Sequence, residues 1–513
     1  MPARAQVPGC DLVLHGHVVD EHDDGALGFA HVVIVGTGRS TATDVDGRFR
    51  FDGMCPGRHV LRFSHVGCVT RERAVELTGD TTVVLHLEHH VLEFSEVEVV
   101  AARPDEHVGQ AHAEVAKDMM ERKGGSGLAE MIDHVPGVSV LRSGPTIGKP
   151  IIHGLSGNRV LTLNQGVRQE DQQWGTDHAP SLDPLGSDRI TVVKGAASVQ
   201  YGADAIGGVV LVEPVQLPVR AGMGGELRAT GSTNGRGGGG NGHLQGGVKG
   251  IDGLGWRVQG SGRYLGDQQA PDYVLSNTGL REAGGSAAIG WRNPKQGVQL
   301  YYSLFDRELG ILRAAHIGNL SDLQDAIASG RPWYTAPFGH RLDAPRQHVR
   351  HQLAKAEARR FLSERDLLVF TYALQLDERR EFDMRRGGRS HIPALHLRLR
   401  THTGDLVLNH YLSDRMHGKL GVGGTHQENV NVPGTGVRPL IPNYRKRTAG
   451  LYLIEHLDLS ERIELEAGAR VEGTLLDVLT YTAVQEFITP HHSFLNHALS
   501  AGLNWSVRDS VRL

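Results

Sequence analysis

The sequence predicts a mainly β protein: a small β-sandwich, then an α+β domain, then an antiparallel transmembrane β-barrel of which about 13 strands are present. Glycine supplies 67 of the 513 residues, close to twice the roughly 7 % of average proteins, which favours turns and strands. Apolar and polar residues alternate along much of residues 221–513, the period of strands with two unlike faces. Ten of the 11 Tyr and four of the five Trp lie beyond residue 220, which indicates a boundary there.

Composition excludes several classes of protein. The net charge of −4, with 39 % hydrophobic and 22 % charged residues, argues against a basic nucleic-acid binder, so no nucleic-acid partner is expected. No run of 18 apolar residues occurs, which excludes a helical membrane span but not spanning strands. Residues 1–10 show no secretory signal, so the true start of the protein stays open.

Residues 12–90 are predicted to form the β-sandwich, because short strands are separated by turn signals every eight to twelve residues. Asp46 and Gly47 form a tight-turn dipeptide between two of these strands. The predicted strands are 12–19, 31–36, 41–43, 49–51, 59–63 and 81–87.

Three cysteines occur, and their spacing matches no paired zinc-ligand pattern. Cys55 and Cys68 end two strands expected to be neighbours, so a disulfide between them is one interpretation. Two buried free thiols are the other.

Residues 93–103 form an extended, β-prone run that ends at Pro104. Such a strand could pair with the sheet edge of a partner. It could equally be a last strand of the sandwich.

Residues 113–215 combine short helices with β-arches. Pro136 and Gly137 end a helix and begin a strand. Residues 152–167 are expected to form a hairpin about a Ser-Gly-Asn turn, and further strands are predicted at 189–195 and 206–212.

Two segments resemble known families. The pattern Gly16-x-Val18-x-Asp20, followed by Gly36-Thr37 and Thr43-Asp44-x-x-Gly47-x-Phe49, resembles the carboxypeptidase-regulatory-like domain, a non-catalytic sandwich. The run Ile190-x-Val192-Val193-Lys194-Gly195-x-x-Ser198-x-x-Tyr201-Gly202-x-x-Ala205-x-Gly207-Gly208-Val209-Val210 resembles the plug domain of TonB-dependent outer-membrane receptors. Val135-Pro136-Gly137-Val138 and Pro150-Ile151-Ile152-His153-Gly154 precede it in the family's order.

The plug resemblance implies a function. This family takes up scarce ligands across the bacterial outer membrane, driven by the TonB energy-transducing complex. It implies a TonB box at Glu96, Val97, Glu98, Val99, Val100 and Ala101. The family closes its barrel with 22 strands, so a chain with about 13 is expected to be truncated. The implied partners are the TonB complex, outer-membrane lipids and a small-molecule or metal substrate.

Residues 221–513 carry the alternation expected of barrel strands. Trp256 and Val258 alternate with Arg257 and Gln259. The same pattern places Leu395, Leu397 and Leu399 opposite His396, Arg398 and Arg400, and Ile463 and Leu465 opposite Glu464 and Glu466. Charged side chains are costly in lipid, so the polar face should line the interior. An amphipathic soluble sheet is the alternative.

Histidine is unusually common: 29 residues, against 28 for Phe, Trp and Tyr together. Asp171, Asp177 and His178 fall within one loop, and its Asp-His-Ala sequence resembles that of zinc-uptake receptors. We therefore expect Asp177 and His178 to be the leading substrate ligands. The further candidates are His153 and Asp171 in the same domain, and His316, His340, His348 and His351 in the outer loops.

The cargo stays open between a transported metal ion (Zn, Cu or Fe) and a metal chelate or siderophore. Imidazole suits such metals, but the histidines could also be solvated surface residues. No catalytic motif with supporting context occurs, so we expect a non-enzyme that requires no cofactor. The alternative function is a non-transporting surface binding protein or adhesin, in which residues 115–214 would lie outside the later strands.

Overall fold

The computed structural model describes residues 9–21, 25–65, 68, 70–87, 112–123, 126–175, 177–194, 198–213, 216–313, 320–330, 332, 334–460, 462–482, 484–508 and 511–512. The predicted linker at 93–103, with its TonB box, lies outside these residues, as does His316. The chain forms two compact units, residues 1–106 and 107–513, and each is described by itself. Among the described residues, no helix is long and apolar enough to cross a membrane.

The first unit is a two-sheet sandwich. One sheet has the order β4 (Arg48–Met54), β1 (Leu12–Asp20), β7 (Thr81–Leu87), with β1 and β7 parallel. The other has the order β3 (Ser40–Ala42), β2 (His31–Ile34), β5 (Gly57–Ser64), β6 (Arg71–Leu77). Apolar side chains from both sheets form one core. The sequence prediction missed β6, because only Val75 and Leu77 of that charged strand turn inward.

The predicted Cys55–Cys68 bridge is wrong, because Cys55 is bonded to Cys10. Cys10 precedes β1 and Cys55 follows β4, and the antiparallel register pairs Leu12 with Met54, which brings these two ends together. The strands ending near Cys55 and Cys68 belong to different sheets. Cys68 Sγ instead lies 3.6 Å from His65 Nδ1.

The second unit begins with a small α+β domain, which we call the plug. Its main sheet has the order β12 (Val167–Arg168), β11 (Val160–Asn164), β14 (Gly208–Val212), β13 (Arg189–Lys194), β8 (His112–Ala116). The strands β9 (Val138–Arg142) and β10 (Gly148–Ile152) form a separate pair. The helices are α1 (Lys117–Arg122), α2 (Leu128–Met131) and α3 (Ser198–Tyr201).

The hairpin expected at 152–167 does not form. β10 pairs with β9, whereas β11 pairs in parallel with β14. Leu161, Val209 and Leu211 pack together in a buried cluster around this pairing. Pairing with β14, which is buried on both faces, is therefore favoured over the hairpin that the Ser-Gly-Asn turn predicts.

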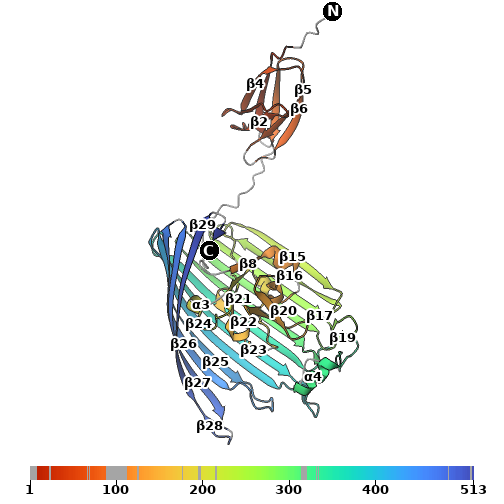
Figure 1. Cartoon of the computed structure of the whole chain (residues 1–513), viewed down its shortest axis with the longest axis vertical. Helices are drawn as coiled ribbons and strands as arrows, with labels where there is room; N and C mark the ends of the chain where they lie inside the picture. Colours follow the sequence, from red (N-terminus) through yellow and green to blue (C-terminus); the bar gives the residue numbers. More distant parts are fainter. Residues whose placement is uncertain are drawn as a thin grey trace, which may run out of the picture. The chain divides into compact units, whose positions relative to one another are not determined.

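Most of the remaining described residues form one antiparallel sheet of 14 strands, close to the predicted number, which we call the wall (Figure 1). Its order along the chain is β15 (Gly222–Ser232), β16 (Gly237–Gly247), β17 (Leu254–Leu265), β20 (Leu280–Arg292), β21 (Gln296–Gly310), β22 (Arg346–Phe361), β23 (Leu367–Phe382), β24 (Leu395–Ser413), β25 (Met416–Asn431), β26 (Asn443–Ser460), β27 (Ile463–Tyr481), β29 (His491–Arg508) and β30 (Val511–Arg512), with β28 (Phe487–Ile488) beside β27. A separate pair, β18 (Gln268–Gln269) and β19 (Val274–Leu275), lies between β17 and β20 in the chain.

The connections differ at the two ends of the wall. At one end the strands join through short turns, such as 414–415 between β24 and β25. At the other end the connections are longer, and the one between β21 and β22 carries α4 (Leu320–Ala328). Outer-membrane barrels place short turns in the periplasm and long loops outside, so the resemblance to outer-membrane receptors implies that the long-loop end faces outward.

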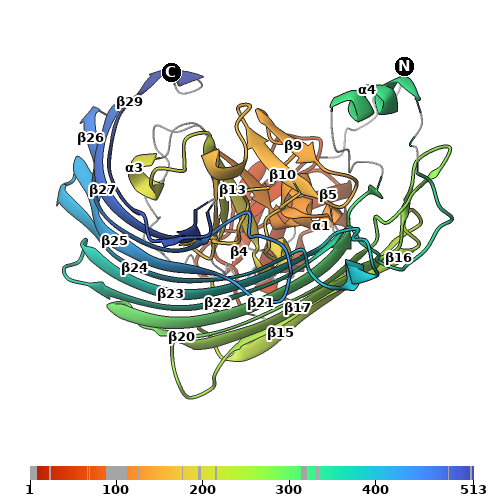
Figure 2. The same cartoon turned by 90° about the horizontal axis from the view of Figure 1, so that it is seen from below.

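The plug lies against the concave face of the wall (Figure 2). Val167 of β12 packs with Leu353 and Ala373 of the wall, and Ile147 packs with Leu280 and Leu309. The helix α3 contacts β26, β27 and β29. This arrangement contradicts the adhesin alternative, which required residues 115–214 to lie outside the strands.

The two faces of the wall follow the predicted alternation in most strands. Val258 is 44 % exposed on the outer face, whereas Arg257 and Gln259 are 5 % and 8 % exposed and face the plug. The prediction is wrong for the first part of β24. There Leu397 and Leu399 are buried on the inner face, and Arg398 and Arg400 point outward.

Candidate functional site

The candidate site is built on the plug loop of residues 169–180, at the outward end of the plug. Lys149 of β10 holds this loop from below: its Nζ donates to the carbonyl oxygens of Gln173 and Gly175, both at 2.7 Å. Lys149 is 4 % exposed, and burial lowers its pKa. The wall holds the loop from the side, since Gln375 accepts from Glu170 N at 3.0 Å and donates to Arg168 O at 2.9 Å.

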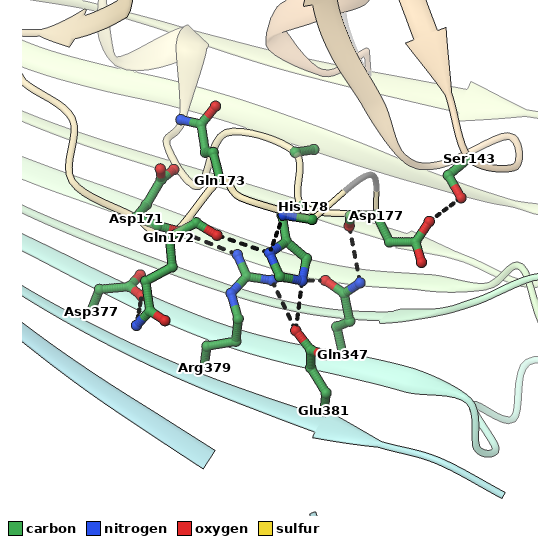
Figure 3. A network of polar contacts seen from close by, with 12 residues as sticks. Ser143, Asp171, Gln172, Gln173, Asp177, His178, Gln347, Asp377, Arg379 and Glu381 are labelled. Atoms are coloured by element: carbon green, nitrogen blue, oxygen red, sulfur yellow. Dashed lines mark hydrogen bonds and ion pairs between the residues drawn. The ribbon is translucent and has the colours of Figure 1, made fainter. Parts of the chain in front are cut away.

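His178, a leading predicted ligand, is buried and has partners at both ring nitrogens (Figure 3). Nδ1 lies 2.8 Å from the carbonyl oxygen of Gln172, and Nε2 lies 2.7 Å from Oε1 of Glu381 on β23. Trp174 packs edge-on against the ring at 4.4 Å between centroids. His178 therefore clamps the loop to the wall, and a metal ion could bind it only after one of these contacts broke.

Asp177 is also held inside the protein. One of its carboxylate oxygens accepts from the Ser143 hydroxyl, which follows β9. Its backbone oxygen accepts from Gln347 Nε2 of β22 at 2.9 Å. The buried Arg379 links this region together, because Nη1 donates to Gln347 at 3.0 Å and Nη2 donates to Asp171 O at 3.3 Å.

Asp171 lies beside His351 and Asp377 of the wall, and all three are 2 % exposed. Asp171 Oδ2 accepts from Ser181 N at 2.5 Å, and His351 Nδ1 lies 3.5 Å from Asp377 Oδ2. Burial raises the pKa of Asp171, and the neighbouring Asp377 charge raises it further. Within the described part of the chain, Asp171 Oδ1 and both His351 nitrogens have no hydrogen-bond partner.

The other predicted residues do not join this group. His153 is exposed in the turn after β10, with a positive φ of 49°. His340 stacks on Tyr264 at 5.3 Å, in the loop between β21 and β22. His348 pairs with Asp306 at 3.0 Å on the outer face of β22, opposite to the face of His351. His316 lies outside the described residues.

A metal-holding cluster is not formed by the residues that the structure describes. No group of three or more His, Cys, Asp or Glu side chains in those ranges has the arrangement needed to hold a metal ion. The predicted loop residues bind one another and the wall instead.

An open cavity of about 200 Å³ lies between the loop and the inner faces of β24, β25 and β26. Its lining includes Arg168, Asp171 and Trp174 from the plug, and Asn429, Tyr444 and Lys446 from the wall. Trp174 is 37 % exposed, so its indole is available to a ligand. Tyr444 donates from its hydroxyl to Gln427 Oε1 at 3.1 Å, which fixes the ring.

Of these lining residues, sequence reasoning found only Asp171. Trp174 carried a usable signal, because it is the only Trp before residue 220 and lies within the predicted loop. No sequence signal indicated Tyr444 or Lys446, since only the curvature of the wall brings β26 to the plug.

A second cavity, of about 370 Å³, lies between plug residues 126–130 and β15 to β17, with Arg263 and Arg307 in its lining.

A plug seated against the inner face of a strand-built wall defines the class of protein: a plugged β-barrel of the bacterial outer membrane. Residues 104–209 match the TonB-dependent receptor plug domain, and residues 14–99 match the CarboxypepD_reg-like domain. The chain therefore contains the plug domain of TonB-dependent receptors, preceded by a carboxypeptidase-regulatory-like domain.

Parts of the chain are similar to known receptors and transporters. A hemin receptor of Yersinia pestis is 41 % identical over 92 residues, which cover 17 % of this chain and 13 % of the relative. The ferric yersiniabactin uptake receptor FyuA of Yersinia pestis has a TM-score of 0.58 at 13 % identity, over 79 % of this chain and 63 % of that one. The copper transporter OprC has a TM-score of 0.58 at 15 % identity, over 78 % and 61 %. The alignments span less than a quarter of the length of the curated relatives.

Proposed function

We propose that the protein takes up a metal chelate, such as a haem or a ferric siderophore, across the outer membrane. The chelate binds in the 200 Å³ cavity between the plug loop and β24 to β26. The observation that carries this proposal is the chemistry of that cavity. An exposed indole, a fixed phenol ring and the Lys446 cation line one outward-facing space, beside Arg168, which pairs with Glu170 at 2.8 Å.

The lining suits a planar or aromatic ligand with polar groups of both kinds, because Lys446 faces the same space as the carboxylates Glu170 and Asp204. Aromatic side chains provide flat apolar contact, and Lys and Arg attract carboxylates or catecholates. Ligand sites commonly combine such apolar surface with a few oriented polar groups.

A bare metal ion fits the described residues less well. His178 already has a partner at each ring nitrogen, and Asp177 accepts from Ser143. A metal would have to displace the contacts that hold the loop to the wall. The hemin receptor's name refers to an iron chelate, and the FyuA and OprC similarities concern the fold alone.

Energy for uptake would come from the TonB complex, acting on residues 96–101. The receptor itself would carry out no covalent chemistry and need no cofactor, since transport requires only binding and release.

Binding to the whole protein in detergent tests the proposal, with hemin, a ferric catecholate and zinc chloride as three separate probes. We expect one of the two chelates to bind and Trp174→Ala to weaken it about tenfold, the effect of losing roughly 1.4 kcal/mol of aromatic contact. His153→Ala is the matched control, because His153 is exposed and outside the cavity lining. Zinc binding that disappears in His178→Ala, with no chelate bound, would refute the proposal in favour of metal-ion uptake.

A further inference from the structure

The inner face of the wall carries a buried arginine whose charge is not balanced. Arg307 lies on β21, is 6 % exposed, and donates from Nη2 to the carbonyl oxygen of Ala179 in the plug at 3.2 Å. Its Nε has no hydrogen-bond partner among the residues that the structure describes. Within that part of the chain, no ion pair joins Arg307 to a carboxylate.

The carboxylate directly opposite Arg307 is already engaged. Glu282 of β20 stands opposite Arg307 of β21 on one side and opposite Arg263 of β17 on the other. It accepts from Arg263 Nε at 2.8 Å and from Nη2 at 2.9 Å. The Phe305 ring lies 5.4 Å from the Arg307 guanidinium, and its π face attracts a cation without neutralising it. Two arginines and one glutamate thus leave one positive charge.

Such a charge is costly where it stands. Removing an ionised group from water carries a large free-energy cost, which an opposite charge or a bound ion can offset. Arginine stays protonated at physiological pH, so Arg307 cannot lower this cost by losing a proton. An anion from outside the chain would supply the missing charge.

Arg307 lines the cavity of about 370 Å³ between the plug and β15 to β17. This volume lies within the range of small-molecule sites. Part of the lining is bare backbone, because Gly238 and Gly239 of β16 have no side chains. A Cβ at Gly238 would lie 2.4 Å from the carbonyl oxygen of Thr230. The cavity therefore has room for a ligand beside the guanidinium.

The remaining lining is rich in hydroxyl groups. Four hydroxyl side chains contribute to it: Ser126, Thr146, Thr230 and Ser232. A hydroxyl can both donate and accept hydrogen bonds. Among the described residues that line this cavity, none has an aromatic ring, and the one carboxylate, Glu130, is paired with Arg142 at 3.1 Å. The lining therefore suits a hydroxylated anion rather than a flat aromatic ligand.

We propose that this cavity binds a small hydroxylated monocarboxylate, with its carboxylate on Arg307 and its hydroxyls on the Ser and Thr side chains. Guanidinium and carboxylate form strong, charge-assisted hydrogen bonds. A single negative charge balances Arg307, whereas a phosphate monoester carries about −1.5 to −2. The inference is independent of the proposed function, because this cavity shares no lining residue with the one at β24 to β26.

Calorimetric titration of the whole protein in detergent tests the site. The probes are gluconate and glycerate, their neutral counterparts glucose and glycerol, and glucose 6-phosphate. Wild-type protein should bind at least one of the two acids. The matching neutral compound should bind roughly ten- to a hundredfold more weakly, the effect of losing a charge-assisted hydrogen bond. Arg307→Gln should weaken binding of the acid by a similar factor.

Two further variants keep the test decisive. Thr146→Phe fills the cavity from the turn between β9 and β10 and leaves Arg307 in place, so it should block binding of the acid. Arg281→Gln is the matched control and should bind the acid as the wild type does. Its arginine is 49 % exposed at the side chain and lies next to the inward-facing Glu282, on the outer face of β20.

Four results would each overturn the proposal. These are failure of both acids to bind wild-type protein, equal affinity for an acid and its neutral counterpart, unchanged affinity in both Arg307→Gln and Thr146→Phe, and tighter binding of glucose 6-phosphate than of gluconate. Trp174→Ala should bind the acid as the wild type does, which separates this site from the one proposed for a chelate.

Discussion

The variant His178→Ala tests whether His178 fastens the plug loop to the wall or serves as a metal ligand. It removes the contacts of the ring with Gln172 O at 2.8 Å and with Glu381 at 2.7 Å. It also removes one partner of the Glu381 carboxylate. Arg379 remains near that carboxylate, with Nη1 3.7 Å from Glu381 Oε1. Leaving a buried polar group without its hydrogen-bond partner costs roughly 1–3 kcal/mol, and more for a charged group. Because the group left behind is the Glu381 carboxylate, which is 26 % exposed at its side chain, we take about 3 kcal/mol.

A loss of about 3 kcal/mol corresponds to roughly a hundredfold increase in local opening of the loop. Hydrogen exchange at the amides of 171–180 measures this directly, and exchange in the buried core of β13 and β14 should not change. His153→Ala is the control, because that side chain is exposed. Unchanged exchange in the loop of His178→Ala would refute the clamp, and the loss of zinc binding without faster exchange would identify a metal ligand instead.

Three further predictions concern stability. Cys55→Ala should lower the stability of the sandwich by about 4 kcal/mol, since its disulfide closes a sequence separation of 45 residues; hydrogen exchange in the first unit measures this, and Cys68→Ala is the control. Leu353→Ala should cost about 3 kcal/mol in chemical denaturation because it opens a cavity beneath the plug, whereas Leu300→Ala, 52 % exposed on the outer face, should cost much less. Burial raises the pKa of Asp183 above its ordinary 3.8, so the folded state binds the proton more tightly and its stability should fall as pH rises above about 4.

Each prediction has an outcome that contradicts it. Equal exchange rates in the two cysteine variants would show that the disulfide does not stabilise the sandwich. Equal losses for the two leucine variants would mean that the plug does not pack on Leu353. Asp183→Asn should flatten the pH dependence of the denaturation midpoint above about pH 4, and an unchanged slope would exclude Asp183 as its source.

The plug could be predicted because its motif encodes backbone constraints. Gly208 has a φ of 149°, and a Cβ there would collide with the carbonyl oxygen of Val193 on the neighbouring strand. Only glycine tolerates this approach, so the Gly-Gly-Val sequence marks the β13–β14 pair. The alternation of inward and outward side chains along the wall strands also depends only on neighbouring residues. Arg257 and Val258, adjacent in the chain, lie on opposite faces.

Which strands pair, and which side chains line a cavity, depends on residues that lie far apart in the sequence. β11 pairs with β14, more than 40 residues away in the chain, and no turn signal indicates that pairing. The sequence predicted that Asp177 and His178 share one loop, but their neighbours Ser143, Gln347 and Glu381 come from three separate segments.

The amino-acid sequence by itself determined the order of domains, the plug motif and the two-faced strands, because these depend on side-chain period and on backbone conformations of adjacent residues. The tertiary structure alone decided which cysteines pair, why Leu397 faces inward, and that Trp174 meets Tyr444 across a cavity. Those outcomes depend on how the curved wall folds around the plug, since distant residues become neighbours only when burial and register bring their strands together.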